Sequence, residues 1–425
     1  MKLLAEARGA WFNQISVTPQ DNPERKRRIG MNQDKLLGLK PAMGWNSWNT
    51  FTWDINERLI RDIADLFVSE GFKDAGYEYI VIDDCWSLKE RDSDGNLVAD
   101  PAKFPSGMKA LADYIHDKGL KFGMYSCVGT HTCAGYPGSF EHEFQDALRF
   151  AEWGVDYLKY DYCFKPRQVS GELMYKRMSL ALKNAGRDIL FSACNWGEDN
   201  VYKWIRESGA HMYRSTGDIR DNWDSIKELT LSQLDQQCYT GSFCHNDMDM
   251  LIVGMYGGSN NDYIGSSGGC TDTEYKTHFA LWSMMGSPLM MGCDIRKATP
   301  FTKRILTNPD LIAINQDIEA RGAYRIKPEP NWFHSQDVFM LVKVLTDGDL
   351  AIGFFNLSDN EREIPLLFWD MGLPYAAGYA LSLYDCWEHK ELGLFKERFS
   401  PTVPAHDCLV VRAKLVRSDS ASNAI

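Results

Sequence analysis

Between about residues 40 and 320, short apolar runs alternate with longer amphipathic segments. The short runs predict strands and the amphipathic segments predict helices. The expected strands include 79–82, 120–125, 155–160, 189–193, 212–214 and 288–291. The expected helices include 108–115, 144–153, 171–184, 201–207, 225–237 and 275–285. Strand–helix alternation produces a parallel sheet, and roughly eight units over about 280 residues match a (β/α)8 TIM barrel, with an open doubly wound sheet as the alternative.

The pattern changes near residue 323, where strand-like runs follow one another without helices between them. Two of the runs flank Asp347-Gly348, a dipeptide that is typical of a hairpin turn. The runs lie at 338–344, 350–355, 379–384 and 408–415. They predict a C-terminal antiparallel β-sandwich domain. We therefore expect four segments, an N-terminal extension at 1–38, the barrel at 39–322, the β domain at 323–417 and a frayed tail at 418–425.

Charge and aromatic content narrow the ligands to consider. The chain has 46 Lys and Arg against 58 Asp and Glu, which gives a net charge of −12. A chain this acidic repels phosphates and anionic lipids, so we expect no nucleic acid partner and no membrane partner. It also has 13 Trp, 19 Tyr and 21 Phe. Aromatic faces with a polar edge suit amphipathic ligands such as sugars.

The N-terminal residues lack the apolar core of a signal peptide, and no run of about 18 apolar residues occurs. This predicts a cytoplasmic protein, or a secreted one if a leader has been removed. The 11 Cys residues include no Cys-x-x-Cys pair, which disfavours a zinc knuckle. Because 11 is an odd number, at least one thiol is free unless it pairs between chains.

Polar and aromatic side chains follow the first six expected strands. A barrel carries its functional groups at the C-terminal ends of the strands, so these side chains should meet on one rim. A single Asp after a strand is commonly a helix cap, whereas polar residues at the same place after several strands predict a shared site. The residues are Trp48, Asp83, Asp84, Trp86, Tyr125, Lys159, Asp161, Cys194, Trp196, Arg214 and Asp218.

Two chemistries fit such a rim. A metal-dependent hydrolase would bind its ion through carboxylates and a histidine. The candidate ligands are Asp83, Asp84, His245, Asp247 and Asp249. A glycosidase would instead use one carboxylate as a nucleophile and one carboxyl group as an acid. Few histidines lie near the strand ends and Trp is abundant there, which favours the glycosidase and predicts no metal.

The positions of the carboxylates predict different protonation states. Lys159 and Asp161 lie two residues apart on one expected strand, so their side chains project to the same side. We expect the charge of Lys159 to keep Asp161 ionised, as a nucleophile requires. Asp218 follows a different strand, and we expect a higher pKa there, as an acid requires.

Six motifs occur in order along the chain. They are AMGWNSW at 42–48, IDDCW at 82–86, CAGYPGS at 133–139, LKYDYC at 158–163, RSTGDI at 214–219 and NDMDML at 246–251. Together they resemble the signature of glycoside hydrolase family 27, which contains α-galactosidases and α-N-acetylgalactosaminidases. The resemblance implies a retaining mechanism on a (β/α)8 barrel with a C-terminal β domain, and neither a metal nor another cofactor.

The resemblance also implies roles for individual residues. Asp161 matches the nucleophile and Asp218 the general acid/base. Asp83 and Asp84 match a pair that hydrogen-bonds the 4- and 6-hydroxyls of galactose, and Lys159 matches a residue that binds hydroxyls beside the nucleophile. The other matching positions are Trp48 under the apolar face of the sugar, Tyr125, Arg214, Asp249 and Met250 in the pocket, and Cys133 with Cys163, which match a disulfide beside the site.

Cys194 and Trp196 match positions that set specificity beside O2 of the sugar. They resemble the α-galactosidase pattern, in which bulky residues leave no room for a 2-acetamido group. We therefore expect a retaining exo-glycosidase acting on terminal α-D-galactosyl residues of an oligosaccharide or glycoconjugate, and a homo-oligomer is possible. The alternatives are a β-L-arabinopyranosidase, an α-N-acetylgalactosaminidase and a non-catalytic galactose-binding protein. Retention predicts that the carboxyl groups of Asp161 and Asp218 lie about 5–6 Å apart.

Overall fold

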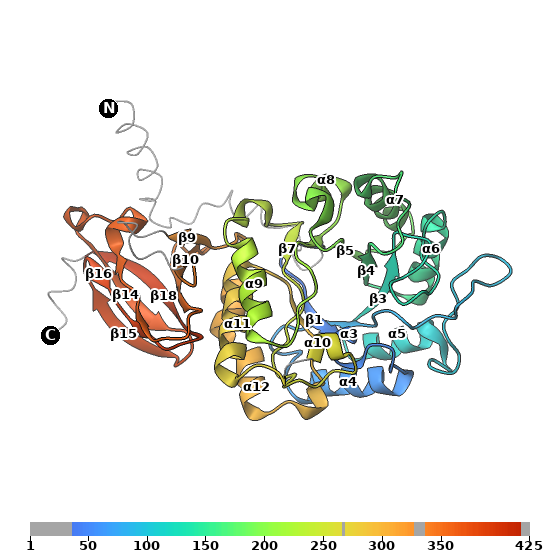
Figure 1. Ribbon diagram of the computed structural model, residues 1–425, viewed down its shortest axis with the longest axis horizontal. Helices are drawn as coiled ribbons and strands as arrows, with labels where there is room; N and C mark the ends of the chain where they lie inside the picture. Colours follow the sequence, from blue (N-terminus) through green and yellow to red (C-terminus); the bar gives the residue numbers. More distant parts are fainter. Residues whose placement is uncertain (1–35, 266–267, 327–335, 418–425) are drawn as a thin grey trace. The chain divides into compact units, whose positions relative to one another are not determined.

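The computed structural model describes residues 36–265, 268–326 and 336–417. Its first part is a sheet of eight parallel strands with helices around it (Figure 1). The strand order is β7-β6-β5-β4-β3-β2-β1-β8. The strands are β1 (Met43–Asn46), β2 (Tyr79–Val81), β3 (Lys121–Cys127), β4 (Tyr157–Asp161), β5 (Leu190–Cys194), β6 (Met212–Arg214), β7 (His245–Asp247) and β8 (Leu289–Met291).

The two ends of this strand order meet. β8 pairs in parallel with β1, and a parallel bridge joins Leu251, just after β7, to Met291 of β8. An open doubly wound sheet would leave two free edges, so that alternative is wrong. The predicted (β/α)8 barrel is confirmed, and the C-terminal ends of its eight strands share one rim.

Helices follow the strands, and several of them bury one side. In α4 the buried Ile60, Ile63 and Phe67 recur at helical spacing. α11 begins with a capping box, in which the Thr271 hydroxyl accepts from the Glu274 N–H and the Glu274 carboxylate accepts from the Thr271 N–H. The helices are α3 (Trp48–Phe51), α4 (Glu57–Ser69), α5 (Gly107–Asp117), α6 (Glu143–Trp153), α7 (Gly171–Lys183), α8 (Ile205–Ser208), α9 (Trp223–Gln233), α10 (Asp262–Gly265), α11 (Asp272–Met285), α12 (Pro300–Leu306) and α13 (Pro309–Asn315).

One expected helix differs from the structure. Residues 201–207 are divided between a 3-10 helix, η2 (Glu198–Lys203), and the short α8. Trp204, between the two, has a φ of −131° and a ψ of −17°, outside the α-helical region, which divides the expected helix.

The second part of the fold is antiparallel. Six strands pair in the order β15-β14-β18-β11-β10-β9, and two small two-stranded sheets, β12-β17 and β13-β16, accompany them. This confirms the predicted C-terminal β domain. The strands are β9 (Tyr324–Ile326), β10 (Val338–Val344), β11 (Leu350–Asn356), β12 (Arg362–Glu363), β13 (Leu366–Leu367), β14 (Tyr379–Asp385), β15 (Lys390–Phe395), β16 (Arg398–Phe399), β17 (Thr402–Val403) and β18 (Asp407–Arg417).

Most of the expected N-terminal extension and all of the expected C-terminal tail lie outside the described residues. Among the helices that the structure describes, none combines the length and the apolar character of a membrane span.

Candidate active site

The C-terminal rim of the barrel encloses a cavity of about 70 Å³. Thirteen of the residues proposed for the site from the sequence line this cavity, together with Asn49. The thirteen are Trp48, Asp83, Asp84, Tyr125, Cys133, Lys159, Asp161, Cys194, Trp196, Arg214, Asp218, Asp249 and Met250. They come together because the parallel strands all end at the same rim.

Asp161 is the last residue of β4, and it is 6% exposed. The Tyr125 hydroxyl donates to Asp161 Oδ2 at 2.7 Å, and the Tyr162 N–H donates to Oδ1 at 2.8 Å. These two hydrogen bonds hold the carboxylate in one orientation in the cavity. Burial raises the pKa of Asp161 to about 6, although the charge of Lys159 and the Tyr125 hydrogen bond oppose this shift.

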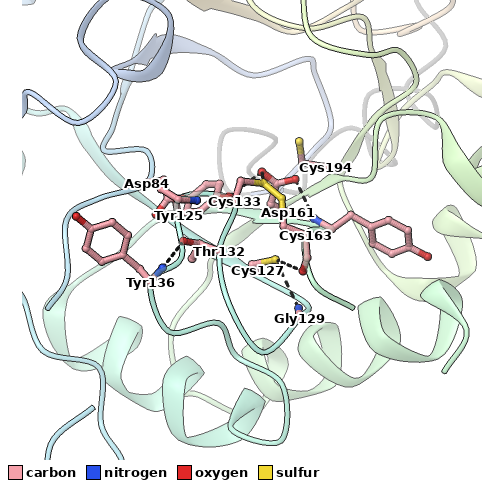
Figure 2. The surroundings of a disulfide bond; sticks show 12 residues. Asp84, Tyr125, Cys127, Gly129, Thr132, Cys133, Tyr136, Asp161, Cys163 and Cys194 are labelled. Atoms are coloured by element: carbon pink, nitrogen blue, oxygen red, sulfur yellow. Dashed lines mark hydrogen bonds between the residues drawn. A yellow bond between two sulfur atoms is a disulfide. The ribbon is translucent and has the colours of Figure 1, made fainter. Parts of the chain in front are cut away.

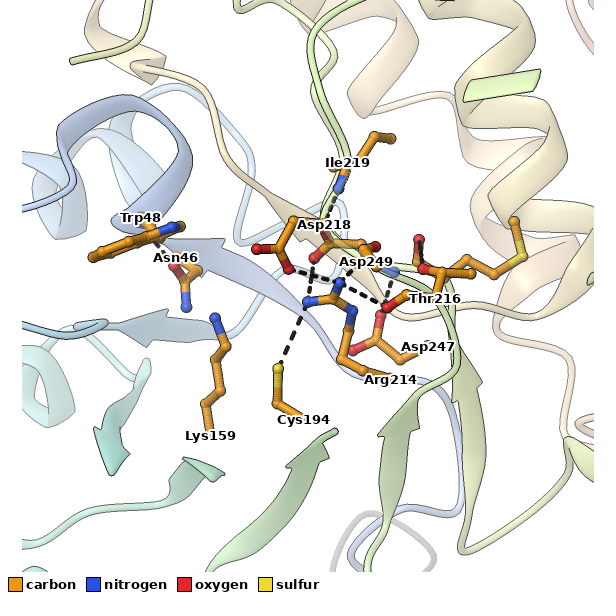
Figure 3. A network of polar contacts seen from close by, with 12 residues as sticks. Asn46, Trp48, Lys159, Cys194, Arg214, Thr216, Asp218, Ile219, Asp247 and Asp249 are labelled. Atoms are coloured by element: carbon orange, nitrogen blue, oxygen red, sulfur yellow. Dashed lines mark hydrogen bonds and ion pairs between the residues drawn. The ribbon is translucent and has the colours of Figure 1, made fainter. Parts of the chain in front are cut away.

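Asp218 lies on the loop after β6, and its side chain is 50% exposed. Arg214 Nη2 donates to Asp218 Oδ1 at 3.0 Å (Figure 3). The same nitrogen donates to the carbonyl oxygens of Thr216 and Gly217 at 3.1 and 2.8 Å, which fixes the loop. Burial favours a higher pKa, but the charges of Arg214 and Lys159 and the hydrogen bond from Arg214 together outweigh it and lower the pKa of Asp218 below its usual value.

The expected order of the two pKa values is therefore wrong for the unliganded protein. Lys159 Nζ donates to Asp83 Oδ2 at 2.8 Å, and its charge also acts on Asp161, where it lowers the pKa less than burial raises it. Burial then dominates at Asp161, whereas Asp218 contacts Arg214 directly. The two-residue period of a strand predicts on which side of the sheet a lysine side chain projects. The flexible side chain then determines which carboxylate its ammonium group contacts.

Asp83 and Asp84 follow β2 and are buried in the cavity wall. Asp83 Oδ2 accepts from Asn46 Nδ2 at 2.7 Å as well as from Lys159. Asp84 accepts from the Cys85 and Ala134 N–H groups at 2.7 and 3.0 Å, and burial raises its pKa. Each carboxylate oxygen takes up to two hydrogen bonds, so the pair retains acceptor capacity for hydroxyl groups.

A disulfide joins Cys133 to Cys163 beside Asp161, with the two Cα atoms 5.2 Å apart (Figure 2). This confirms the pairing that the family resemblance implied. Cys133 Sγ lies 3.5 Å from Asp161 Oδ2. The bond therefore ties the loop after β3 to the end of β4, next to the carboxylate.

Cys194 and Trp196 form another part of the wall, at the end of β5. Cys194 Sγ lies 3.6 Å from Arg214 Nη1, and burial raises the pKa of the thiol well above its usual value, so the thiol is neutral. Trp196 has a φ of 58°, a left-handed conformation that costs a bulky residue about 1–3 kcal/mol. The Tyr162 ring meets its indole edge-on, with ring centroids 6.3 Å apart.

Asn49 in the cavity and Asn46 behind it were not predicted from the sequence. Asn46 donates to Asp83 and accepts from the Trp48 N–H at 2.8 Å, so it orients two cavity residues. Asn46 belongs to the motif that supplied Trp48, and Asn49 follows that motif directly, which was the available signal. Trp86 was expected on the rim and is instead buried, where its Nε1 donates to the Tyr125 carbonyl.

The metal alternative receives no support from the side-chain geometry. Within the described ranges, one compact group of possible metal ligands occurs, formed by Cys133, Asp161 and Cys163. Its two sulfur atoms are bonded to each other. His245 belonged to the expected ligand set, but its Nε2 contacts the Gly38 carbonyl oxygen at 2.9 Å.

Comparisons with known proteins agree with this geometry. The sequence matches the family model described as α-galactosidase A over residues 40–317 and that of the α-galactosidase C-terminal β-sandwich domain over residues 335–413. An α-galactosidase of Coffea arabica is 42% identical over 372 residues, which cover 87% of this chain and 93% of that protein. The α-galactosidase mel1 of Schizosaccharomyces pombe is 46% identical over 407 residues, with 88% and 89% covered. An α-galactosidase structure from Saccharomyces cerevisiae with raffinose has a TM-score of 0.80 at 31% identity, with 89% of this chain and 98% of that chain covered. The chain therefore belongs to the α-galactosidases of glycoside hydrolase family 27.

Proposed function

We propose that this chain is a retaining exo-α-galactosidase, with Asp161 as the nucleophile and Asp218 as the general acid and base. One observation carries the proposal. A single cavity holds a buried carboxylate, fixed by two hydrogen bonds, and a half-exposed carboxyl group beside an arginine. A small cavity, as opposed to a long groove, supports hydrolysis of a terminal sugar.

In the first step, an oxygen of Asp161 attacks the anomeric carbon of the galactoside. The bond from this carbon to the glycosidic oxygen breaks, its electron pair stays on that oxygen, and Asp218 supplies the proton. In the second step, the Asp218 carboxylate takes a proton from water. The water oxygen attacks the anomeric carbon and releases Asp161. Two inversions give net retention.

Buried acceptors supply the choice of sugar in this proposal. Asp83 and Asp84 face the cavity, and an epimer that placed no hydroxyl against Asp84 would leave its buried oxygens without part of their hydrogen bonds. Lys159 adds a donor on the same side. Trp196 and Cys194 fill the wall assigned to O2, so a 2-acetamido group is expected to be excluded.

The test is hydrolysis of a panel of nitrophenyl glycosides, with the first-formed anomer followed by NMR. We expect turnover of the α-galactoside with α-galactose appearing first. The α-N-acetylgalactosaminide and the β-L-arabinopyranoside should be poor substrates. Raffinose, with which the structure of the Saccharomyces cerevisiae relative was solved, serves as the oligosaccharide substrate. First appearance of β-galactose would overturn the retaining assignment, and no turnover of any substrate would favour a galactose-binding protein.

As the pH rises, kcat/KM is predicted to start falling near pH 6. The first step needs one proton on the Asp161–Asp218 pair, because Asp218 donates it while Asp161 attacks as an anion. With the pKa of Asp161 at about 6 and that of Asp218 lowered, the pair holds one proton below about pH 6 and loses it above. We expect kcat/KM to fall about tenfold per pH unit above that value. Initial rates at low substrate concentration measure this, and an unchanged rate up to pH 8 would contradict it.

Asp84→Asn is predicted to weaken the choice of sugar. The variant keeps the size of the side chain but loses the charge that a substrate hydroxyl would meet. A hydrogen bond to a charged group is worth about 1.5–3 kcal/mol, so kcat/KM for the α-galactoside should fall about 10- to 100-fold. The rate on the α-glucoside, whose O4 points elsewhere, should change much less. Equal losses on both sugars would show that Asp84 does not select at this position.

Several expectations from the sequence stay predictions. They concern the boundaries of the four segments, a cytoplasmic location and a homo-oligomeric state. Cell fractionation and light scattering of the purified protein would test the last two.

A further inference from the structure

A second cavity, of about 20 Å³, shares four lining residues with the candidate active site. The shared residues are Lys159, Arg214, Asp249 and Met250. Asp247, the last residue of β7, lines only the second cavity and is 7% exposed. The proposed mechanism gives it no role.

Arg214 divides its hydrogen-bond donors between two carboxylates. Nη2 donates to Asp218 at 3.0 Å, and Nη1 pairs with Asp249 Oδ1 at 2.9 Å. Its Nε is buried without a hydrogen-bond partner in the described part of the chain. Figure 3 shows the Asp247 carboxylate beside this side chain, on the other side from Asp218.

Asp247 is fixed by the backbone of both neighbouring segments. Its Oδ1 accepts from the Asp249 N–H at 3.0 Å. Its carbonyl oxygen accepts from the Ser215 N–H at 2.9 Å, at the start of the loop that carries Asp218. Asp247 is therefore held between the strand of Arg214 and the loop of Asp249.

The charged groups around Asp247 and those around Asp218 overlap. The titratable and charged groups facing Asp247 are Tyr157 and Lys159 of β4, Arg214 of β6 and Asp249 after β7. Those facing Asp218 are Arg214, Lys159, Asp161, Asp249 and Cys194. Burial raises the pKa of Asp247 to about 6, against the opposing charge of Arg214, so Asp247 is largely ionised above pH 6.

We propose that Asp247 is a positioning residue whose ionised carboxylate offsets the charge of Arg214, so that the Asp161–Asp218 pair keeps to higher pH the proton that Asp218 donates. A guanidinium with fewer counter-charges would stabilise the anionic form of Asp218 more strongly. The inference rests on the proposed function, because only glycosidase chemistry needs that proton.

Asp247→Asn tests the proposal, because it removes the charge and keeps an acceptor for the Asp249 N–H. Below about pH 6 Asp247 takes up a proton itself, so the kcat/KM profiles of variant and wild type should converge there. Above that pH, the fall of kcat/KM in the variant should begin about 0.5–1 pH unit lower than in the wild type. This corresponds to a loss in kcat/KM of roughly 3- to 10-fold at pH 8. A 2,4-dinitrophenyl α-galactoside, whose leaving group needs no proton, should show little of this loss.

Asp385→Asn is the matched control. Asp385 is also buried, and it accepts from the N–H two residues ahead, that of Trp387, at 2.8 Å. It lies in β14 of the β domain. Its pH profile should superimpose on that of the wild type.

An equal loss at every pH, or an equal loss with both leaving groups, would mean that Asp247 only maintains structure, and would overturn the proposal. If circular dichroism shows that Asp247→Asn is unfolded, Asp247→Ser gives the same comparison with a smaller side chain. Failure of both variants to fold would identify a folding role and overturn the proposal. The proposed function is decided separately, because its failure would appear as absent turnover by the wild-type enzyme.

Discussion

Replacement of Asp161 by alanine is expected to lower kcat for α-galactoside hydrolysis by about 10⁴-fold or more, as loss of a covalent nucleophile does in other hydrolases. Asp83, another carboxylate of the cavity, is held by Lys159 and Asn46 and is not free to take over this role. Steady-state rates with nitrophenyl α-galactoside measure the loss. Added azide should partly restore turnover. It attacks the anomeric carbon from the vacated side as the glycosidic bond breaks, and the product is β-galactosyl azide.

Tyr125→Phe is the matched control for this variant. It removes the hydroxyl that donates to Asp161 Oδ2 and keeps the buried ring. Loss of one hydrogen bond to a charged group should cost about 10- to 100-fold in rate, far less than loss of the carboxylate. Thermal unfolding should place both variants close to the wild type. A nearly normal rate for Asp161→Ala in folded protein would remove Asp161 from the mechanism.

The sequence predicted the barrel and the cavity lining well for a physical reason. Parallel strands that alternate with helices all end at one rim, so residues far apart along the chain, such as Trp48 and Asp249, meet in one cavity. The side on which a strand residue lies follows from its period of two. Neither inference requires the conformation of an individual side chain.

The protonation order was not predictable in the same way. It depends on which cation reaches which carboxylate, and Lys159 reaches Asp83 while Arg214 reaches Asp218. It also depends on burial, which raises the pKa of both carboxyl groups but dominates only at Asp161. Asn46 was missed for a related reason. Its importance lies in hydrogen bonds to Asp83 and Trp48, and these appear only when the side chains are placed.

Replacement of Asp218 by alanine is expected to produce a loss that depends on the leaving group. Raffinose and nitrophenyl α-galactoside need a proton on the departing oxygen, so their hydrolysis should slow by about 10²–10⁴-fold. A 2,4-dinitrophenyl α-galactoside needs no such proton, and its first step should stay fast. Without Asp218 to take a proton from water, the second step becomes slow. The galactosyl group should then accumulate on Asp161, which a burst of dinitrophenolate equal to the enzyme concentration would reveal.

The same variant distinguishes Asp218 from a residue that only binds the sugar. Mass spectrometry should find the intact protein heavier by one galactosyl group, and peptide mapping should locate it on Asp161. Azide, a nucleophile that needs no general base, should release this group as α-galactosyl azide, the anomer opposite to that expected from Asp161→Ala. Asp84→Asn serves as the comparison, because a binding residue should slow both leaving groups alike. An equal loss with both leaving groups and no trapped galactosyl group in Asp218→Ala would mean that the proton comes from another residue.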